Sequence, residues 1–400
     1  MAVRVRLLEL QNEADSLAAG RAAGRMLPES NLRGWAALVP LSPALIATGL
    51  REAGLVVLAG DLAALALGNL AQLWAAGRSL SDALTQPEAK SIAAELSARA
   101  AAIEAAACGP GLGAAGRSDL PRWTLPRSVL AHGRTLVMGI VNVTPDSFSD
   151  GGRFLDPARA IEHGLALVRE GCDLLDIGGE STNPFVSQPI DAAEELRRVL
   201  PVVRELALRA GVPISIDTSK AEVAEAALAN GAEVVNDVSG LARDPRLGRV
   251  CAEQGAALCL MHMRGTAQEM NARARYDDLH GEVAAELDAS LSRALEAGVD
   301  PERIILDPGL GFAKTAAHNF ALLRRLRELL QLGRPLLVGA SRKSFLGKAT
   351  GKAAPDRLYG SIAAAALAAM SGAAVIRVHD VAQTREALAV ADAVRTTTTT

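Results

Sequence analysis

The chain has 400 residues, more than one small domain needs, and its formal net charge at pH 7 is only −3. This weak charge gives no sign of a nucleic-acid or anionic-membrane partner. Half of the residues are hydrophobic but only 3% are aromatic, so the core must be built mainly from alanine, leucine and valine.

Residues 1–107 predict a small α/β domain, to which the sequence assigns no chemistry. Apolar runs at 35–39 and 55–58 are typical of strands, and helical patterns follow at 62–74 and 89–107.

Residues 54–77 are apolar enough to raise the question of a membrane span, which takes ~20 uninterrupted apolar residues. Polar side chains interrupt this stretch at Asp61, Asn69 and Gln72. We therefore predict a short strand followed by a buried helix, and no membrane partner.

Residues 108–127 are rich in glycine and proline and predict a linker. Their glycines Gly109, Gly111 and Gly113 have the spacing of a nucleotide-binding loop. No strand pattern precedes them and no capped helix pattern follows, so the linker interpretation is favoured.

The cysteines indicate a reducing compartment. They have no C-x-x-C spacing and lie mostly among apolar residues, at Cys108, Cys172, Cys251 and Cys259. Buried thiols fit this pattern better than disulfides or a metal site. Since the first residues carry charges and show no cleavage signature, we expect a cytoplasmic protein.

Short β-branched runs alternate with longer helical patterns in residues 128–395. The strand candidates are 136–141, 174–177, 214–216, 234–235, 258–261, 304–306, 336–338 and 375–378. Helical patterns include 192–210, 221–229, 277–297, 319–330 and 357–370. Eight such units in about 250 residues close a parallel barrel, so the predicted fold class is α/β, a (β/α)8 TIM barrel preceded by the smaller N-terminal domain. The threonine run 396–400 predicts a disordered tail.

Polar side chains follow every predicted barrel strand at its C-terminal end, where such barrels carry their active sites. They are Asn142, Asp176, Asp217, Asn236 with Asp237, His262, Asp307, Ser341 to Lys343, and Arg377 with His379. A single aspartate after a strand is often only a helix N-cap. Polar groups at all eight strand ends together predict one active site at the barrel mouth.

Three of these positions, Asp217, Asn236 and Asp307, offer hydrogen-bond acceptors from different strands. A carboxylate can accept from two adjacent N–H groups of a heterocyclic ring, and each charge-assisted bond contributes ~1.5–3 kcal/mol in a dry site. The alternative is an internal polar network that only holds the barrel mouth together.

Positive charge at the mouth is expected from Lys343, Arg377 and His379. In SRKS, residues 341–344, a helical turn begins soon after a strand, so backbone N–H groups and a positive dipole end are available to an anion. RVHD, residues 377–380, repeats this arrangement one strand later, where barrels often bind phosphate. Isolated lysines and arginines are usually solvated surface, but at strand ends they predict anion ligands.

The histidines lack the H-x-x-x-H and H-E-x-x-H spacings of a metal held by protein ligands alone. A magnesium ion held mainly by substrate phosphates, with Asn142 as a protein oxygen ligand, fits the coordination habits of Mg²⁺. No nucleophile paired with a base is evident in the sequence, which argues against acyl-enzyme chemistry.

Eight segments resemble, in order, the motifs of the dihydropteroate synthases, folate-pathway enzymes that join p-aminobenzoate to a dihydropterin pyrophosphate. They are NVTPDSFSDGG (142–152), DIGGEST (176–182), SIDTSK (215–220), NDVSG (236–240), LMHMRG (260–265), LDPGLGFAK (306–314), GASRKSFLG (339–347) and RVHDV (377–381). The combination of SRKS and RVHD separates this family from other pterin-binding barrels.

The resemblance implies roles for the matching positions. Catalytic roles fall to Asp217, Asp307, Lys343, Arg377 and His379. The pterin would be bound by Asp217, Asn236, Asp307 and Lys343, with Met261 and Phe312 near its faces. Asn142, Arg377 and His379 would bind the pyrophosphate and its magnesium. Phe148, Thr182, Pro184, Phe312 and Ser344 would frame p-aminobenzoate, the substrate that sulfonamides mimic.

The resemblance also implies a homodimer and a mechanism without a general base. Pyrophosphate leaves the exocyclic methylene of the pterin with help from magnesium, Arg377 and His379, and the neutral aromatic amine then attacks. Positioning and electrostatics would supply most of the acceleration.

One position departs from the family pattern. The second loop reads STNP where the family usually reads STRP, so Asn183 replaces an arginine that helps to grip the pyrophosphate. Either catalysis is weakened, or a nearby arginine such as Arg153 or Arg264 substitutes for it.

Two other hypotheses stay open. A pterin-binding methyltransferase domain shares the barrel and the Asp and Asn acceptors, but it would have little use for SRKS and RVHD. A degenerate, non-catalytic paralogue used for interaction or regulation would bind the pterin without forming product.

Overall fold

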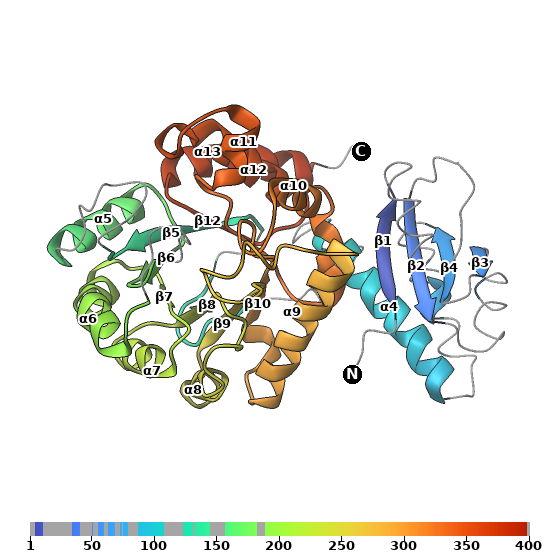
Figure 1. The fold of residues 1–400 in the computed structure, drawn as a ribbon, viewed down its shortest axis with the longest axis horizontal. Helices are drawn as coiled ribbons and strands as arrows, with labels where there is room; N and C mark the ends of the chain where they lie inside the picture. Colours follow the sequence, from blue (N-terminus) through green and yellow to red (C-terminus); the bar gives the residue numbers. More distant parts are fainter. Residues whose placement is uncertain are drawn as a thin grey trace.

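The computed structural model describes residues 5–10, 34–40, 50, 55–59, 63–68, 73, 75–78, 87–107, 123–130, 133–144, 157–181 and 189–397. Within these residues the chain forms a barrel surrounded by helices and a smaller sheet at one side of it (Figure 1).

The barrel has eight parallel strands. They are β5 (Leu136–Asn142), β6 (Leu174–Gly178), β7 (Ile214–Asp217), β8 (Val234–Asp237), β9 (Ala257–Met261), β10 (Ile304–Asp307), β11 (Leu337–Val338) and β12 (Val375–Val378). Their order is β10-β9-β8-β7-β6-β5-β12-β11, and a parallel bridge between Leu306 and Leu336 joins the two ends of this sheet. The predicted TIM barrel is therefore confirmed.

Helices cover the outside of the barrel (Figure 1). They are α5 (Pro157–Arg169), α6 (Ala192–Arg209), α7 (Ala221–Ala229), α8 (Leu247–Gln254), α9 (Leu279–Glu296), α10 (Ala316–Arg324), α11 (Ser344–Thr350), α12 (Leu358–Met370) and α13 (Val381–Thr396). Short 3-10 turns form at η1 (Pro301–Arg303), η2 (Leu326–Leu332) and η3 (Ala354–Asp356). Both faces of the strands are buried, one inside the barrel and one under the helices, which explains their short continuous apolar runs.

The N-terminal end of the barrel interior is closed by residues assigned to the linker in the sequence prediction. Trp123 and Leu125 are buried against the interior side chains of the strands, among them Met138 and Ile305. The indole Nε1 of Trp123 donates to the carbonyl of Arg303 at 3.1 Å. Residues 123–127 therefore belong to the barrel, because its apolar interior needs a cover at the end away from the mouth.

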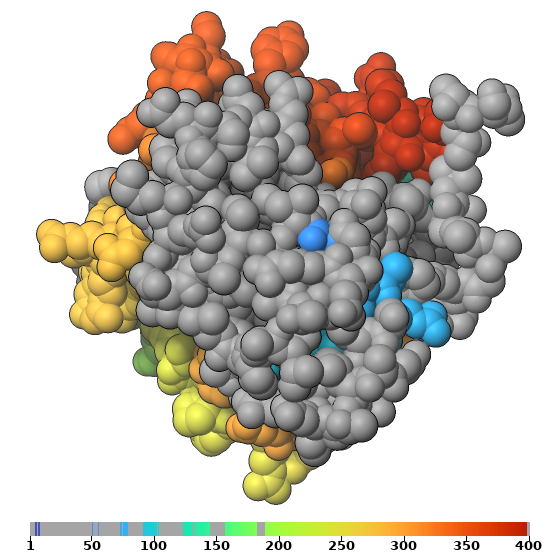
Figure 2. Space-filling view, turned by 90° about the vertical axis from the view of Figure 1, so that its right-hand side faces the viewer, coloured from blue at the N-terminus to red at the C-terminus, as the bar shows by residue number. Residues whose placement is uncertain are grey.

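The smaller sheet consists of β1 (Arg6–Leu10), β2 (Gly34–Pro40), β4 (Ala63–Gly68) and β3 (Val56–Ala59), in that spatial order and all antiparallel. Helix α4 (Pro87–Ala107) packs against η2 of the barrel. The Gln331 side chain accepts from the Leu7 N–H at 2.9 Å and donates to the Leu7 carbonyl at 3.1 Å, so it pairs with β1 as a neighbouring strand would. Figure 2 looks at the molecule from this side, with the orange and red C-terminal part of the barrel at the top.

Three sequence predictions differ from the structure. The helix predicted at 62–74 is wrong over β4, because this segment pairs on both sides, with β2 and β3, as a central strand. The helix predicted at 319–330 is interrupted at Arg325, whose backbone leaves the helical region at φ −111° and whose buried guanidinium pairs with Glu328 at 2.6 Å. Helix α13 includes Thr396, the first residue of the predicted tail, and residues 398–400 lie outside the described residues.

Across the described ranges, no helix combines the length and the apolar character that a bilayer span would require.

Candidate active site

Four of the predicted polar residues lie at or near the C-terminal ends of four barrel strands. Asp217, Asn236 and Asp307 fall within the last residues of β7, β8 and β10, so the strands extend one or two residues beyond the apolar runs that predicted them. Arg377 is the third residue of β12. These ends open at the same mouth, which is where a parallel barrel collects its functional side chains.

The guanidinium of Arg377 joins the ends of β6 and β7. Its Nε donates to Asp176 Oδ2 at 2.6 Å and its Nη2 donates to Asp217 Oδ2 at 2.8 Å. The amide of Asn236 donates to the same Asp176 oxygen at 2.9 Å. The sequence prediction assigned Asp217 to the pterin and Arg377 to the pyrophosphate, but the two side chains contact each other.

Asp176 was predicted to lie at the barrel mouth but was given no ligand to bind. It is fully buried, and among the described residues its Oδ1 has no hydrogen-bond partner. A buried carboxylate oxygen without a donor is costly, so it marks a place for a ligand N–H group or a water molecule. Its position near the end of β6 placed it at the mouth, but the sequence does not show that its carboxylate is buried.

Burial is the main cause of the raised pKa values of the acidic groups at the mouth. It raises the pKa of Asp217 to about 7, and the neighbouring Asp176 carboxylate adds to this rise while Arg377 opposes it. Burial also raises the pKa of Asp307, against the effect of Lys343. For Arg377, burial alone would lower the pKa, but the two adjacent carboxylates raise it above its usual value, so the guanidinium stays charged.

Lys343 reaches over the loop that follows β10. Its Nζ donates to the Leu310 carbonyl and lies 4.6 Å from the centroid of the Phe312 ring, within cation–π range. Burial lowers the pKa of Lys343 to about 8, with Asp307 opposing the shift. Gly311 permits this approach, because a Cβ atom at this position would lie 3.0 Å from the Lys343 side chain.

His379 lies beside Ser341 and is neutral. Its Nδ1 is 3.0 Å from the Ser341 hydroxyl oxygen, and its backbone N–H donates to the same oxygen at 3.2 Å. Burial, assisted by Arg342 and Arg377, lowers the pKa of His379 to about 3. A neutral His379 can offer a hydrogen bond to an anion, and its predicted role as a ligand of the pyrophosphate stays a prediction.

Three of the remaining predicted ligand residues can be placed at the barrel mouth. Asn142 ends β5 and lies across Gly178 from Asp217, since a Cβ at Gly178 would be 3.8 Å from Asn142 Oδ1 and 3.4 Å from Asp217 Cβ. Met261 ends β9 and is buried, whereas Ser344 begins α11 and is exposed. Phe148, Thr182, Asn183 and Pro184 lie outside the described residues.

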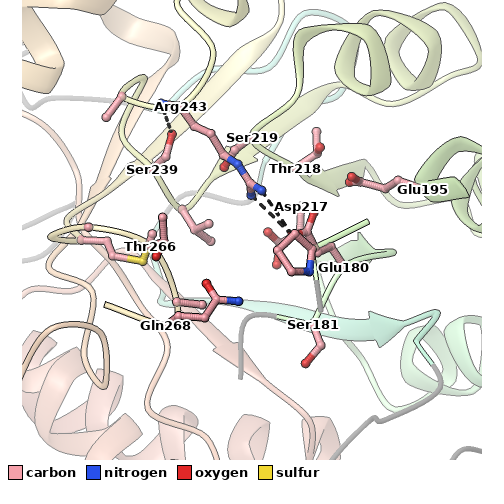
Figure 3. A pocket seen from close by; sticks show the side chains of 16 residues that line it. Glu180, Ser181, Glu195, Asp217, Thr218, Ser219, Ser239, Arg243, Thr266 and Gln268 are labelled. Atoms are coloured by element: carbon pink, nitrogen blue, oxygen red, sulfur yellow. Dashed lines mark hydrogen bonds and ion pairs between the residues drawn. The ribbon is translucent and has the colours of Figure 1, made fainter. Parts of the chain in front are cut away.

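A pocket of about 410 Å³ adjoins Asp217 on the side of β6 to β9 (Figure 3). Lys220 forms ion pairs with Glu180 and with the buried Glu195, and these two carboxylates line the pocket. Arg243 approaches Glu180 from the opposite wall at 3.5 Å. Sequence reasoning did not find this pocket, because its residues come from four separate segments, the ones that follow β6, β7, β8 and β9 together with the end of β7 and the start of α6.

Of the two arginines proposed to replace the charge missing at Asn183, Arg264 is already engaged. Its guanidinium pairs with Glu282 at 2.8 Å and with Glu286, and it lies 4.0 Å from the centroid of the Tyr276 ring. Arg153 lies outside the described residues.

Within the part of the chain that the structure describes, no three His, Cys, Asp or Glu side chains cluster as metal ligands would. The three cysteines in this part, Cys172, Cys251 and Cys259, are free and buried.

Comparison with known proteins finds similarity to pterin-binding enzymes and to dihydropteroate synthases. The family model described as pterin binding enzyme matches residues 138–379. The dihydropteroate synthase of Mycobacterium leprae is 50% identical over 264 residues, which cover 64% of this chain and 92% of that synthase.

Solved structures agree with the sequence comparison. The Yersinia pestis dihydropteroate synthase in complex with a sulfonamide drug superimposes with a TM-score of 0.66 at 43% identity, covering 68% of this chain and 99% of that one. The Xanthomonas albilineans dihydropteroate synthase with 4-aminobenzoic acid superimposes with a TM-score of 0.62 at 47% identity, covering 66% and 94% of the two chains.

Proposed function

Because the chain belongs to the pterin-binding enzyme family and its relatives are dihydropteroate synthases, we infer that it catalyses their reaction. It condenses 6-hydroxymethyl-7,8-dihydropterin pyrophosphate with p-aminobenzoate to give 7,8-dihydropteroate and pyrophosphate, and it is a transferase of folate biosynthesis. The observation that carries this conclusion is the set of acceptors and cations from β6, β7, β8, β10 and β12 at one barrel mouth.

Asp217, Asn236, Asp307 and Lys343 bind the pterin in this proposal. The buried carboxylates accept hydrogen bonds from adjacent N–H groups of the ring, and Asp176 offers its unpartnered Oδ1 from below. Met261 and Phe312 then flank the ring, since both come from loops or strands at the same mouth. Each buried charge-assisted bond contributes ~1.5–3 kcal/mol, which suits tight binding of a small polar heterocycle.

Arg377, His379 and Asn142 serve the leaving group. The methylene C–O bond of the pterin substrate breaks, the pyrophosphate takes the electron pair, and a C–N bond forms to the aromatic amine, which releases one proton to solvent. Arg377 supplies positive charge and neutral His379 a hydrogen bond. The amide oxygen of Asn142 suits a hard cation, and magnesium, when bound with the pyrophosphate, neutralises part of its charge.

p-Aminobenzoate is framed by Phe312 and Ser344 among the described residues, with Phe148, Thr182 and Pro184 as the further proposed contacts. The sulfonamides act as its analogues at this site, which makes the enzyme their target. We propose that the enzyme is cytoplasmic and forms a homodimer. Exposed apolar side chains on α12 and α13 support the dimer, namely Leu367, Met370, Val390 and Val394.

A condensation assay tests the reaction and its metal requirement together. The purified chain, given the pterin pyrophosphate and p-aminobenzoate, should release dihydropteroate and pyrophosphate in equal amounts. Chelation of divalent cations should lower the rate at least about tenfold, because the multiply charged pyrophosphate leaving group then lacks part of its counter-charge. Added Mg²⁺ should restore it.

The same assay separates the other hypotheses. Binding of 6-hydroxymethylpterin without product would indicate a non-catalytic paralogue. Transfer of a methyl group from methyltetrahydrofolate, with no condensation, would indicate a methyltransferase.

Replacing Asn183 by arginine tests whether the missing charge limits turnover. If it does, Asn183→Arg should raise kcat/KM for the pterin pyrophosphate about tenfold, because an added guanidinium to pyrophosphate contact contributes ~1.5–3 kcal/mol. Gln254→Arg, at the exposed C-terminal end of α8 and so at the end of the barrel away from the mouth, is the matched control. An unchanged rate would show that other residues already supply this charge.

A further inference from the structure

A buried lysine next to the pterin site has no role in the reaction as described above. Lys314 follows the loop after β10 and is only 8% exposed. Its Nζ lies 2.8 Å from His262 Nδ1 and donates to the Phe312 carbonyl at 3.0 Å. Burial lowers its pKa to about 7, with Asp307 opposing the shift. A lysine is rarely retained at such a position unless its contacts are needed.

The histidine that faces Lys314 is held in one protonation state. Burial lowers the pKa of His262 to about 4, so the imidazole is neutral. Its Nε2 is 3.0 Å from Glu286 Oε2, and a carboxylate only accepts, so the ring proton is on Nε2. Nδ1 is therefore an acceptor, and Lys314 is its donor. Glu286 belongs to helix α9 and is in turn paired with Arg264. The contacts from Lys314 through His262 to Glu286 are therefore anchored on this helix.

The loop between β10 and α10 depends on side chains for its shape. Ala313 adopts a positive φ of 47°, and its carbonyl accepts from the Tyr276 hydroxyl at 2.9 Å. The Gly311 N–H donates to Asn319 Oδ1 at 2.6 Å. These contacts fix the backbone of the loop at Ala313 and Gly311. Lys314 fixes it at the carbonyl of Phe312, whose ring contacts Lys343 of the active site.

We infer that Lys314 is a positioning residue for p-aminobenzoate: it ties the Phe312 carbonyl to His262 and so fixes the Phe312 ring beside the place where the aromatic amine binds. The ring has Lys343 on one face, so it cannot shift without disturbing that pterin ligand as well. This inference rests on the proposed function, because it assigns the neighbour of the ring as p-aminobenzoate. Lys314 acts through Phe312 and touches no reacting atom.

A double-mutant cycle in the full-length chain tests this inference. Lys314→Met removes the donor but keeps most of the side-chain volume, and Phe312→Leu removes the ring. Each single variant should raise the KM for p-aminobenzoate about tenfold. The double variant should be no worse than Phe312→Leu alone, because residues that act through one contact are non-additive. Additive effects, or a normal KM in Lys314→Met, would overturn the inference.

Two controls keep the result interpretable. The circular dichroism spectrum of Lys314→Met should match that of the unmodified protein, which shows that the barrel is folded, and Lys352→Met at an exposed position should leave every parameter unchanged. If Lys314→Met does not fold, Lys314→Arg keeps donors at this position and should hold the KM within about threefold of the original. A folded Lys314→Arg with the larger KM defect would contradict the inference.

Failure of the proposed function gives a different result. In that case the unmodified chain makes no dihydropteroate at all. Titration of the chain with p-aminobenzoate in the presence of 6-hydroxymethylpterin and pyrophosphate then measures binding directly, and equal affinity in the unmodified and Lys314→Met proteins would overturn the positioning role independently.

Discussion

Replacing Asp217 by alanine should abolish measurable pterin binding and lower kcat/KM by about 10²–10⁴. The carboxylate accepts from Arg377 at 2.8 Å and lies beside Gly178 at the end of β7. Its loss removes two charge-assisted hydrogen bonds to the ring, each worth ~1.5–3 kcal/mol, and 1.4 kcal/mol corresponds to a factor of about ten. Calorimetric titration with 6-hydroxymethylpterin and the condensation assay measure the two effects.

The controls for this substitution separate charge from folding. Asp217→Asn keeps the shape of the side chain and an oxygen for Arg377, so it should fold normally yet bind the pterin poorly. Asp356→Ala, at an exposed position, should bind and turn over as the unmodified enzyme does. Near-normal turnover in Asp217→Ala would contradict the assignment of the site.

The barrel and its mouth were predictable because both depend on local patterns. Short runs of two to six residues, separated by amphipathic helices, specify the strands, and polar residues at the ends of these runs specify the mouth. Asp217, Asn236 and Asp307 were found in this way, and the structure places them at the ends of β7, β8 and β10. The spacing of apolar residues within a short segment distinguishes a strand from a helix, so these predictions need no knowledge of long-range contacts.

Features that depend on long-range contacts were predicted wrongly or were not predicted at all. The segment 63–68 is a strand because β2 and β3 pair with it, and nothing within the segment itself identifies those partners. The pairing of Arg377 with Asp176 joins residues 201 positions apart, so the sequence did not reveal it. The neutral state of His379 is likewise a consequence of burial, which a strand-end motif does not report.

Substituting Arg377 by methionine should have an effect as large as the loss of Asp217, for a different reason. The guanidinium compensates the charge of both Asp176 and Asp217, at 2.6 and 2.8 Å. Removing one partner of a buried ion pair costs ~3–5 kcal/mol, because a charge is left uncompensated. We therefore expect turnover to fall by about 10²–10⁴ and pterin binding at pH 7 to weaken with it. Arg246→Met, at an exposed position, is the control.

The defect in Arg377→Met should depend on pH with a definite sign. The pKa of Asp217 is about 7 with Arg377 present, and Arg377 lowers it, so removal of Arg377 moves this pKa above 7. At pH 7 the carboxyl group of the variant is then protonated and accepts hydrogen bonds poorly. Raising the pH from 7 to 9 ionises it, so the affinity of the variant for 6-hydroxymethylpterin should recover relative to that of the unmodified enzyme.

The ratio of the two affinities is the quantity to compare, because Lys343, with a pKa of about 8, titrates over the same range in the unmodified enzyme. A ratio that approaches one as the pH rises shows that Arg377 acts on the pterin site through the ionisation of Asp217. A ratio that stays constant, together with lost turnover, would show that Arg377 serves the leaving group alone. The contacts favour the first result, because in this structure both carboxylates bond directly to the guanidinium.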